Sequence, residues 1–134
     1  MATKQIFVNL AVKDLAKSKA FFEALGFSFN PQFTNESGAC LVISDTIYAM
    51  LLTEEFFKQF TSKEIVDAKK STEVLICLST ESRAEVDGLV SKAVAAGGRI
   101  YNEPQDHGFM YGHGFEDLDG HQWELAYMEP SHVQ

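Results

Sequence analysis

The feature that most constrains this chain is a repeat in the order of its expected elements. A strand, a capped helix with a glycine stop, a short strand ended by proline, and a hairpin occur twice, at a spacing of roughly 60 residues. A repeat of that length is too long for a solenoid unit and favours duplication of a βαβββ module. The order predicts a single domain over residues 1–134, with module one at 4–53, a connector at 54–71 and module two at 72–128.

Alternation and capping residues define module one. Its first strand alternates an apolar face with a face that carries Phe7 and Asn9. Asp14 is a typical N-cap for the helix that follows, and Gly26 is a typical stop. The predicted elements are a strand at 5–12, a helix from Asp14 to about Leu25, a strand at 27–30 ended by Pro31, and a hairpin over 39–52 that turns at 44–46.

Module two repeats these signals. Thr80 and Ser82 can cap its helix, and Gly97 with Gly98 ends it. The hairpin turns at residues 117–120, where Gly120 supplies a positive φ angle. The predicted elements are a strand at 73–79, a helix to Ala96, a strand at 99–102 before Pro104, and hairpin strands at 109–116 and 121–128.

The connector is charged and contains two short stretches with helical character, 54–60 and 62–67. Phe56, Phe57 and Phe60 give its first stretch an apolar side, which suits an ordinary amphipathic linker helix.

Together these elements predict an α+β fold of two paired βαβββ modules. Each module alone would leave the second face of its sheet uncovered. Pairing the modules, within one chain or across a dimer, would build a curved mixed sheet with a cleft made from those second faces.

Composition excludes several classes of function. The chain is 46% hydrophobic over 134 residues, enough for a core without metals or disulfides, and Cys40 and Cys77 lie in apolar runs, where we expect packed thiols. The net charge of −8 argues against a nucleic-acid partner. The chain shows no leader pattern and no apolar run of the roughly 20 residues that a membrane span needs, so we expect no membrane partner and a cytoplasmic protein.

Three stretches resemble a known family. They are the opening VNLAVKDLAKSKAFFEALGF, the restart VLICLST and the closing FEDLDGHQWELAYM. They resemble the vicinal oxygen chelate superfamily, which includes glyoxalase I, fosfomycin- and bleomycin-resistance proteins and extradiol dioxygenases. The chain is most similar to the small glyoxalase/bleomycin-resistance type, and this resemblance implies a small organic ligand and a homodimer.

The resemblance also implies positions for a divalent metal such as Zn, Ni, Mn or Fe. Enzymes of the family hold it with His or Glu on the first and last strands of each module. The matching positions here are Phe7, Met50 or its neighbour Leu51, Glu73 and Glu124. Phe, Met and Leu offer nothing to a hard cation, so only two oxygen ligands remain. The metal site is therefore expected to be degenerate, and a dioxygenase, which needs two histidines, is disfavoured.

Strand alternation separates the other candidates. It places Glu124 and Trp123 on opposite faces of the last strand, with Trp123 in the core. His113 shares a face with Tyr111, but their register against Glu124 is open. Glu73 and Glu124 are either two cleft carboxylates, which would raise the pKa of one of them, or two solvated glutamates at strand ends.

Three functions remain open. The preferred hypothesis is a small-molecule-binding protein whose cleft is lined by Phe7, Asn9, Met50, Tyr111 and His113. The alternative is a divalent-metal-dependent lyase or isomerase resembling glyoxalase I, with Glu73, Glu124 and His113 as metal ligands. A third hypothesis uses Glu73 and Glu124 as catalytic acid and base without a metal.

Overall fold

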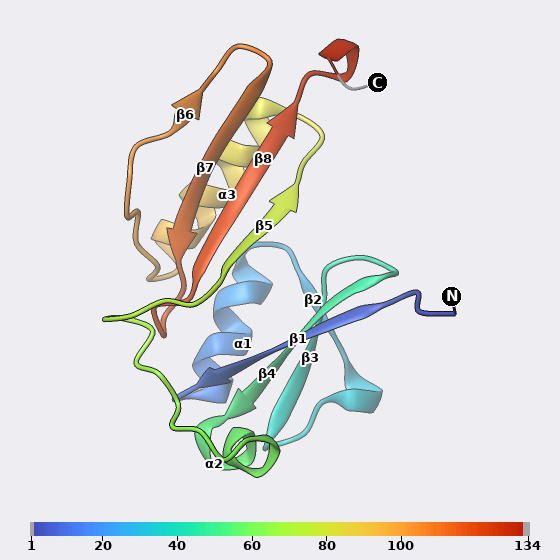
Figure 1. The fold of residues 1–134 in the computed structure, drawn as a ribbon, viewed down its shortest axis with the longest axis vertical. Helices are drawn as coiled ribbons and strands as arrows, with labels where there is room; N and C mark the ends of the chain where they lie inside the picture. The colour runs from blue at the N-terminus through green and yellow to red at the C-terminus, as the bar shows by residue number, and fades with distance from the viewer. Residues whose placement is uncertain (1, 133–134) are drawn as a thin grey trace. The chain divides into compact units, whose positions relative to one another are not determined.

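The structure, a computed structural model, describes residues 2–132 and divides into two compact units, Met1–Val66 and Asp67–Gln134. Each unit contains one four-stranded mixed sheet and one main helix (Figure 1). The α+β class and the repeated βαβββ order are thus confirmed. No helix within residues 2–132 has both the length and the apolar character needed to cross a bilayer.

The first unit has strand order β1-β4-β3-β2. Strands β1 and β4 are parallel, and the other neighbouring pairs are antiparallel. The elements are β1 (Ile6–Val12), α1 (Leu15–Ala24), β2 (Ser28–Asn30), β3 (Gly38–Val42), β4 (Ile47–Thr53) and α2 (Glu54–Phe57), with 3-10 turns at Pro31–Phe33 and Lys58–Phe60.

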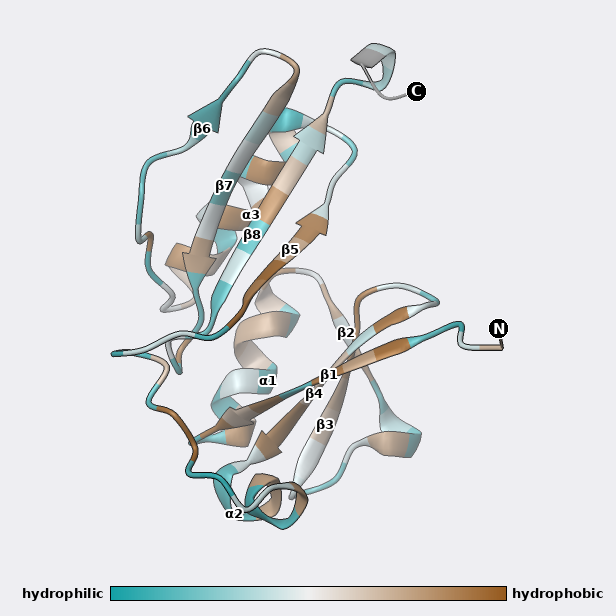
Figure 2. Cartoon of the chain, in the orientation of Figure 1, coloured by the Kyte–Doolittle hydropathy of each residue, from teal (hydrophilic) through white to brown (hydrophobic). Residues whose placement is uncertain are grey.

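The second unit repeats this topology with strand order β5-β8-β7-β6. Its parallel pair is β5 with β8, again the first and last strands of the module. The elements are β5 (Leu75–Ser79), α3 (Arg83–Ala95), β6 (Gln105–Asp106), β7 (Met110–Glu116) and β8 (Gln122–Met128), with a 3-10 turn at Pro130–His132. Figure 2 shows that its two edge strands differ, since β5 is hydrophobic and β6 hydrophilic.

Both main helices begin at the predicted caps. The Asp14 side chain accepts a hydrogen bond from the backbone N–H of Lys17, and the Ser82 side chain accepts one from Glu85, both at 3.0 Å. These bonds satisfy backbone donors that a first helical turn leaves unpaired. Gly26 follows α1 with a φ angle of 101°, a conformation that costs glycine little.

Two predicted elements were wrong. The helix expected at 62–67 does not form, because this short stretch contains β-branched Ile65 and Val66 and cannot meet the cost of nucleation alone. The strand expected at 99–102 is reduced to one bridge, in which Arg99 and Glu116 exchange both backbone hydrogen bonds. Pairing with β7 resumes after Pro104, which has no N–H to donate, as β6.

Each sheet has one face packed against its helix. In the second unit, Phe115, Trp123 and Leu125 lie on that face and are at most 2% exposed. They share the core with Val86, Val90 and Ala93 of α3. The opposite face of the sheet, which we call the open face of the second sheet, carries β8 residues of even number and their cross-strand partners.

Asp117 organises the hairpin between β7 and β8. One carboxylate oxygen accepts hydrogen bonds from the backbone N–H groups of Asp119 and His121, and the other accepts one from the Trp123 indole, all at 3.0 Å. Gly120 completes the turn with a φ angle of 92°. Burial raises the pKa of Asp117 above its ordinary value.

Candidate functional site

The open face of the second sheet is organised around Glu124. In the register of the sheet, Glu124 lies opposite Gly114 on β7 and next to Cys77 on β5. Paired residues of neighbouring strands project to the same face, so the carboxylate and the thiol lie side by side. Glu124 is half-buried, although α3 packs against the opposite face of its sheet.

Two glycines beside Glu124 leave room for Tyr101. Gly112 and Gly114 both belong to the open face, where they contribute no side chain. The hydroxyl of Tyr101 occupies part of this space, only 2.7 Å from where a Cβ on Gly114 would lie. The bridge between Arg99 and Glu116 positions Tyr101, because residues 99 and 101 then project to the same side.

Electrostatics keep the two acidic donors of this face protonated. Burial, together with the charges of Glu124 and Glu116, raises the pKa of Tyr101 to about 12. Partial burial and the Glu124 carboxylate also raise the pKa of the Cys77 thiol. At neutral pH the face therefore presents a phenol O–H and a thiol beside a carboxylate, and Cys77 is a poor nucleophile.

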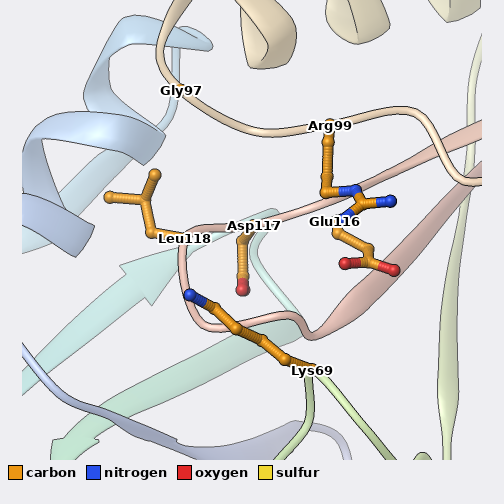
Figure 3. A pocket seen from close by; sticks show the side chains of 6 residues that line it. All are labelled: Lys69, Gly97, Arg99, Glu116, Asp117 and Leu118. Atoms are coloured by element: carbon orange, nitrogen blue, oxygen red, sulfur yellow. The ribbon is translucent and has the colours of Figure 1, made fainter.

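A small cavity of about 240 Å³ adjoins this face at the end of the β7–β8 hairpin. Figure 3 shows Arg99 pointing toward Glu116, with Lys69 reaching in from the segment before β5. Its remaining lining residues are Gly97, Asp117 and Leu118. The cavity thus brings two cationic side chains to the edge of a face whose other charges are carboxylates.

The structure brings three predicted ligand-binding residues together on the first sheet. Asn9 pairs with Met50 across β1 and β4, and Phe7 pairs with Tyr48, whose ring it stacks against at 4.8 Å between centroids. All four residues project to the face opposite Leu10, Ala49 and Leu51, which are buried. This face offers aromatic, thioether and amide groups but no anionic donor.

Tyr111 and His113 lie on the helix face of the second sheet, away from Glu124. The Tyr111 hydroxyl donates a 2.6 Å hydrogen bond to Asp87 of α3. His113 pairs with Leu125, and its Nε2 lies 3.3 Å from the Asn102 carbonyl oxygen. The structure therefore does not join these two predicted residues to the open face.

Glu73 is also separate from Glu124. The predicted strand 73–79 begins two residues later, so Glu73 precedes β5 and is exposed. The β5 residue paired with Glu124 is Cys77, four positions further along the strand. At about 3.3 Å per residue, this displaces Glu73 by roughly 13 Å along the sheet.

The residues at the expected metal positions do not fit a divalent metal centre. Within residues 2–132, no three His, Cys, Asp or Glu side chains cluster closely enough to hold a metal ion. Phe7 and Met50 supply no hard donor, and the strand neighbours of Glu124 are a protonated thiol and a glycine. The donor set therefore supports no step through such a metal.

Sequence reasoning missed Tyr101 and Cys77. Cys77 was expected to be a packed thiol like the buried Cys40, but it is exposed on the open face. Alternation alone leaves two possible faces for Cys77 on β5. The register of β5 against β8 shows that Cys77 shares the face of Glu124. The alternating glycines of YGHGF were the available signal for a close approach by another residue, because glycine is otherwise unfavourable inside a strand.

Comparisons with known proteins agree on one family. The model of the Glyoxalase/Bleomycin resistance protein/Dioxygenase superfamily matches residues 4–125. The solved structure of hypothetical protein SA1046 from S. aureus is 33% identical, with a TM-score of 0.77 over 92% of this chain and 93% of that chain. No curated protein sequence matches this chain.

More distant structures share the fold alone. A glyoxalase-related enzyme from Fulvimarina pelagi is 21% identical, with a TM-score of 0.75 over 92% of this chain and 88% of its own. The fosfomycin resistance protein FosX from Mesorhizobium loti is 14% identical, with a TM-score of 0.71 over 98% of each chain.

Proposed function

Since this chain belongs to the Glyoxalase/Bleomycin resistance protein/Dioxygenase superfamily, we propose that it binds a small organic molecule on the open face of its second sheet without a divalent-metal centre. The observation that carries the proposal is the group of polar side chains on this face around Gly112 and Gly114, namely Tyr101, Cys77 and Glu124. A few convergent polar groups that fix the orientation of a ligand are typical of a small-molecule site.

The open face of the first sheet supports the same kind of ligand chemistry. Phe7 is 47% exposed although it stacks on Tyr48, and Met50 lies on the same face. Aromatic and thioether groups favour apolar rings rather than metal ions. The name of FosX shows that other chains with this fold act in resistance to a small molecule, which is compatible with the proposal.

Metal analysis separates this proposal from the metal-dependent alternative resembling glyoxalase I. Protein purified without chelator should contain far less than one equivalent of metal, and titration with Ni²⁺, Zn²⁺ or Mn²⁺ should give no tight binding. Elemental analysis and calorimetry measure both, with Glu124→Ala as the control. Stoichiometric binding that this substitution abolishes, or turnover of methylglyoxal with glutathione, would establish the alternative instead.

We further propose that the protein is a homodimer. The first strand of each module is a sheet edge, and both edges expose large apolar side chains, namely Ile6 and Phe7 on β1 and Val74 and Leu75 at β5. Exposed apolar edges invite pairing with another chain. Size-exclusion chromatography with light scattering should give twice the mass of 14.9 kDa at micromolar concentration. A monomeric mass would contradict the dimer.

A further inference from the structure

We propose that Tyr101 is the hydrogen-bond donor that selects the ligand of the open face, and that this ligand is an uncharged molecule with an acceptor next to a donor, such as an amide. This inference rests on the proposed function and names the ligand class for the same site. It is carried by the placement of one hydroxyl, one carboxylate and two glycines.

The hydroxyl of Tyr101 lies over Gly114 on the open face and is available to a ligand. The ring carbon Cζ of Tyr101 is 3.3 Å from where a Cβ on that glycine would be. Among the residues that the structure describes, none accepts a hydrogen bond from this hydroxyl. A partly buried phenol favours a partner, and a ligand oxygen above the glycines would supply one.

The neighbouring charges determine which kind of ligand can pair with the Tyr101 hydroxyl. Burial and the charges of Glu124 and Glu116 raise the pKa of Tyr101, so its O–H remains available to donate a hydrogen bond. The same carboxylates disfavour an anion, while Glu124 can accept a hydrogen bond from a ligand donor. A simple cation offers no acceptor to the phenol. The positive charges of Lys69 and Arg99 in the adjoining cavity also offset the carboxylates, which weakens their attraction for a cation. An uncharged donor–acceptor pair satisfies both groups.

The test uses benzamide as a probe, with benzoate and benzylammonium as charged counterparts of similar size. Titrations followed by ¹H–¹⁵N NMR should show that benzamide perturbs the amides of Gly112 and Gly114 and binds better than either ion. In Tyr101→Phe the dissociation constant for benzamide should rise roughly three- to tenfold, the loss of one hydrogen bond. The two ions should bind this variant as they bind the wild type.

Tyr127→Phe is the matched control, because it removes a phenol O–H from the helix face of the same sheet. It should leave benzamide binding unchanged, and urea unfolding of both variants excludes a structural cause. Equal benzamide affinity in Tyr101→Phe and wild type, or preference for benzoate, would overturn the inference while leaving the proposed function standing. Benzamide shifts that avoid Gly112 and Gly114 altogether would count against both.

Alanine substitutions at Gly114 and Gly112 test the role of Tyr101 without changing Tyr101 itself. In Gly114→Ala the new Cβ meets the Trp123 backbone carbonyl oxygen and, at 2.7 Å, the Tyr101 hydroxyl, so in a folded variant benzamide affinity should fall as in Tyr101→Phe. In Gly112→Ala the nearest atom is the Leu125 carbonyl oxygen at 3.5 Å, an ordinary contact. If the variant at position 112 loses affinity and the variant at 114 folds and keeps it, Tyr101 is not the selecting residue.

Discussion

Replacing Gly120 with alanine should lower the free energy of unfolding by about 2–5 kcal/mol, from positive-φ strain and overpacking together. The residue has a φ angle of 92°, which L-residues with a Cβ rarely adopt. Its Cβ would also lie 2.7 Å from the Lys69 nitrogen and 2.8 Å from the Ala68 carbonyl carbon. Because these are backbone atoms, no rotamer change relieves the contact. Urea unfolding measures the loss.

Gly108→Ala is the control for this substitution within the same unit. Gly108 has a φ angle of 81°, but no atom lies within 4 Å of its Cβ position. Its substitution should therefore cost only the backbone strain, about 1–2 kcal/mol. The difference between the two losses measures the cost of the contact between position 120 and the backbone of residues 68–69. Equal losses would mean that this contact does not contribute to the effect of Gly120→Ala.

Local signals in the sequence were sufficient to predict most of the fold. The caps at Asp14 and Ser82 and the turn at residues 117–120 depend on atoms within a few positions of each other, so residue type alone identifies them. The repeat of these local units then gave the α+β class and the βαβββ order. The prediction that Trp123 lies in the core is confirmed, and strand alternation was the signal for it.

The candidate site depended on pairings that the sequence does not contain. Alternation divides a strand into two faces but cannot match the faces of different strands, so Tyr111 and His113 were grouped with a cleft although they face α3. Glu73 precedes β5, and the register of β5 against β8 places Cys77, four positions further along, beside Glu124. Tyr101 joined the site only through the distant bridge from Arg99.

Replacing Asp117 with alanine should be the most damaging single change at the hairpin. Its carboxylate satisfies three N–H donors, including the indole of the fully buried Trp123. Leaving such donors unpaired costs roughly 3–5 kcal/mol in all. Denaturant unfolding followed by Trp123 fluorescence measures the loss. A loss no larger than that of Asp106→Ala, which removes an exposed ion pair with Arg83, would contradict this role.

The losses of unfolding free energy in Asp117→Ala and Asp106→Ala should change in opposite directions with pH. Burial raises the pKa of Asp117, so its contribution is complete below the pKa of the unfolded chain and falls as the pH rises through the folded pKa. The cost of Asp117→Ala should therefore be larger in acid than at neutral pH. The backbone N–H of Gly108 and the Arg83 guanidinium lower the pKa of Asp106, whose contribution is lost as the pH falls. Asp106→Ala should accordingly cost less in acid. Unfolding curves in acid and at neutral pH measure both losses. If the two losses change in the same direction, burial does not determine the pKa of Asp117.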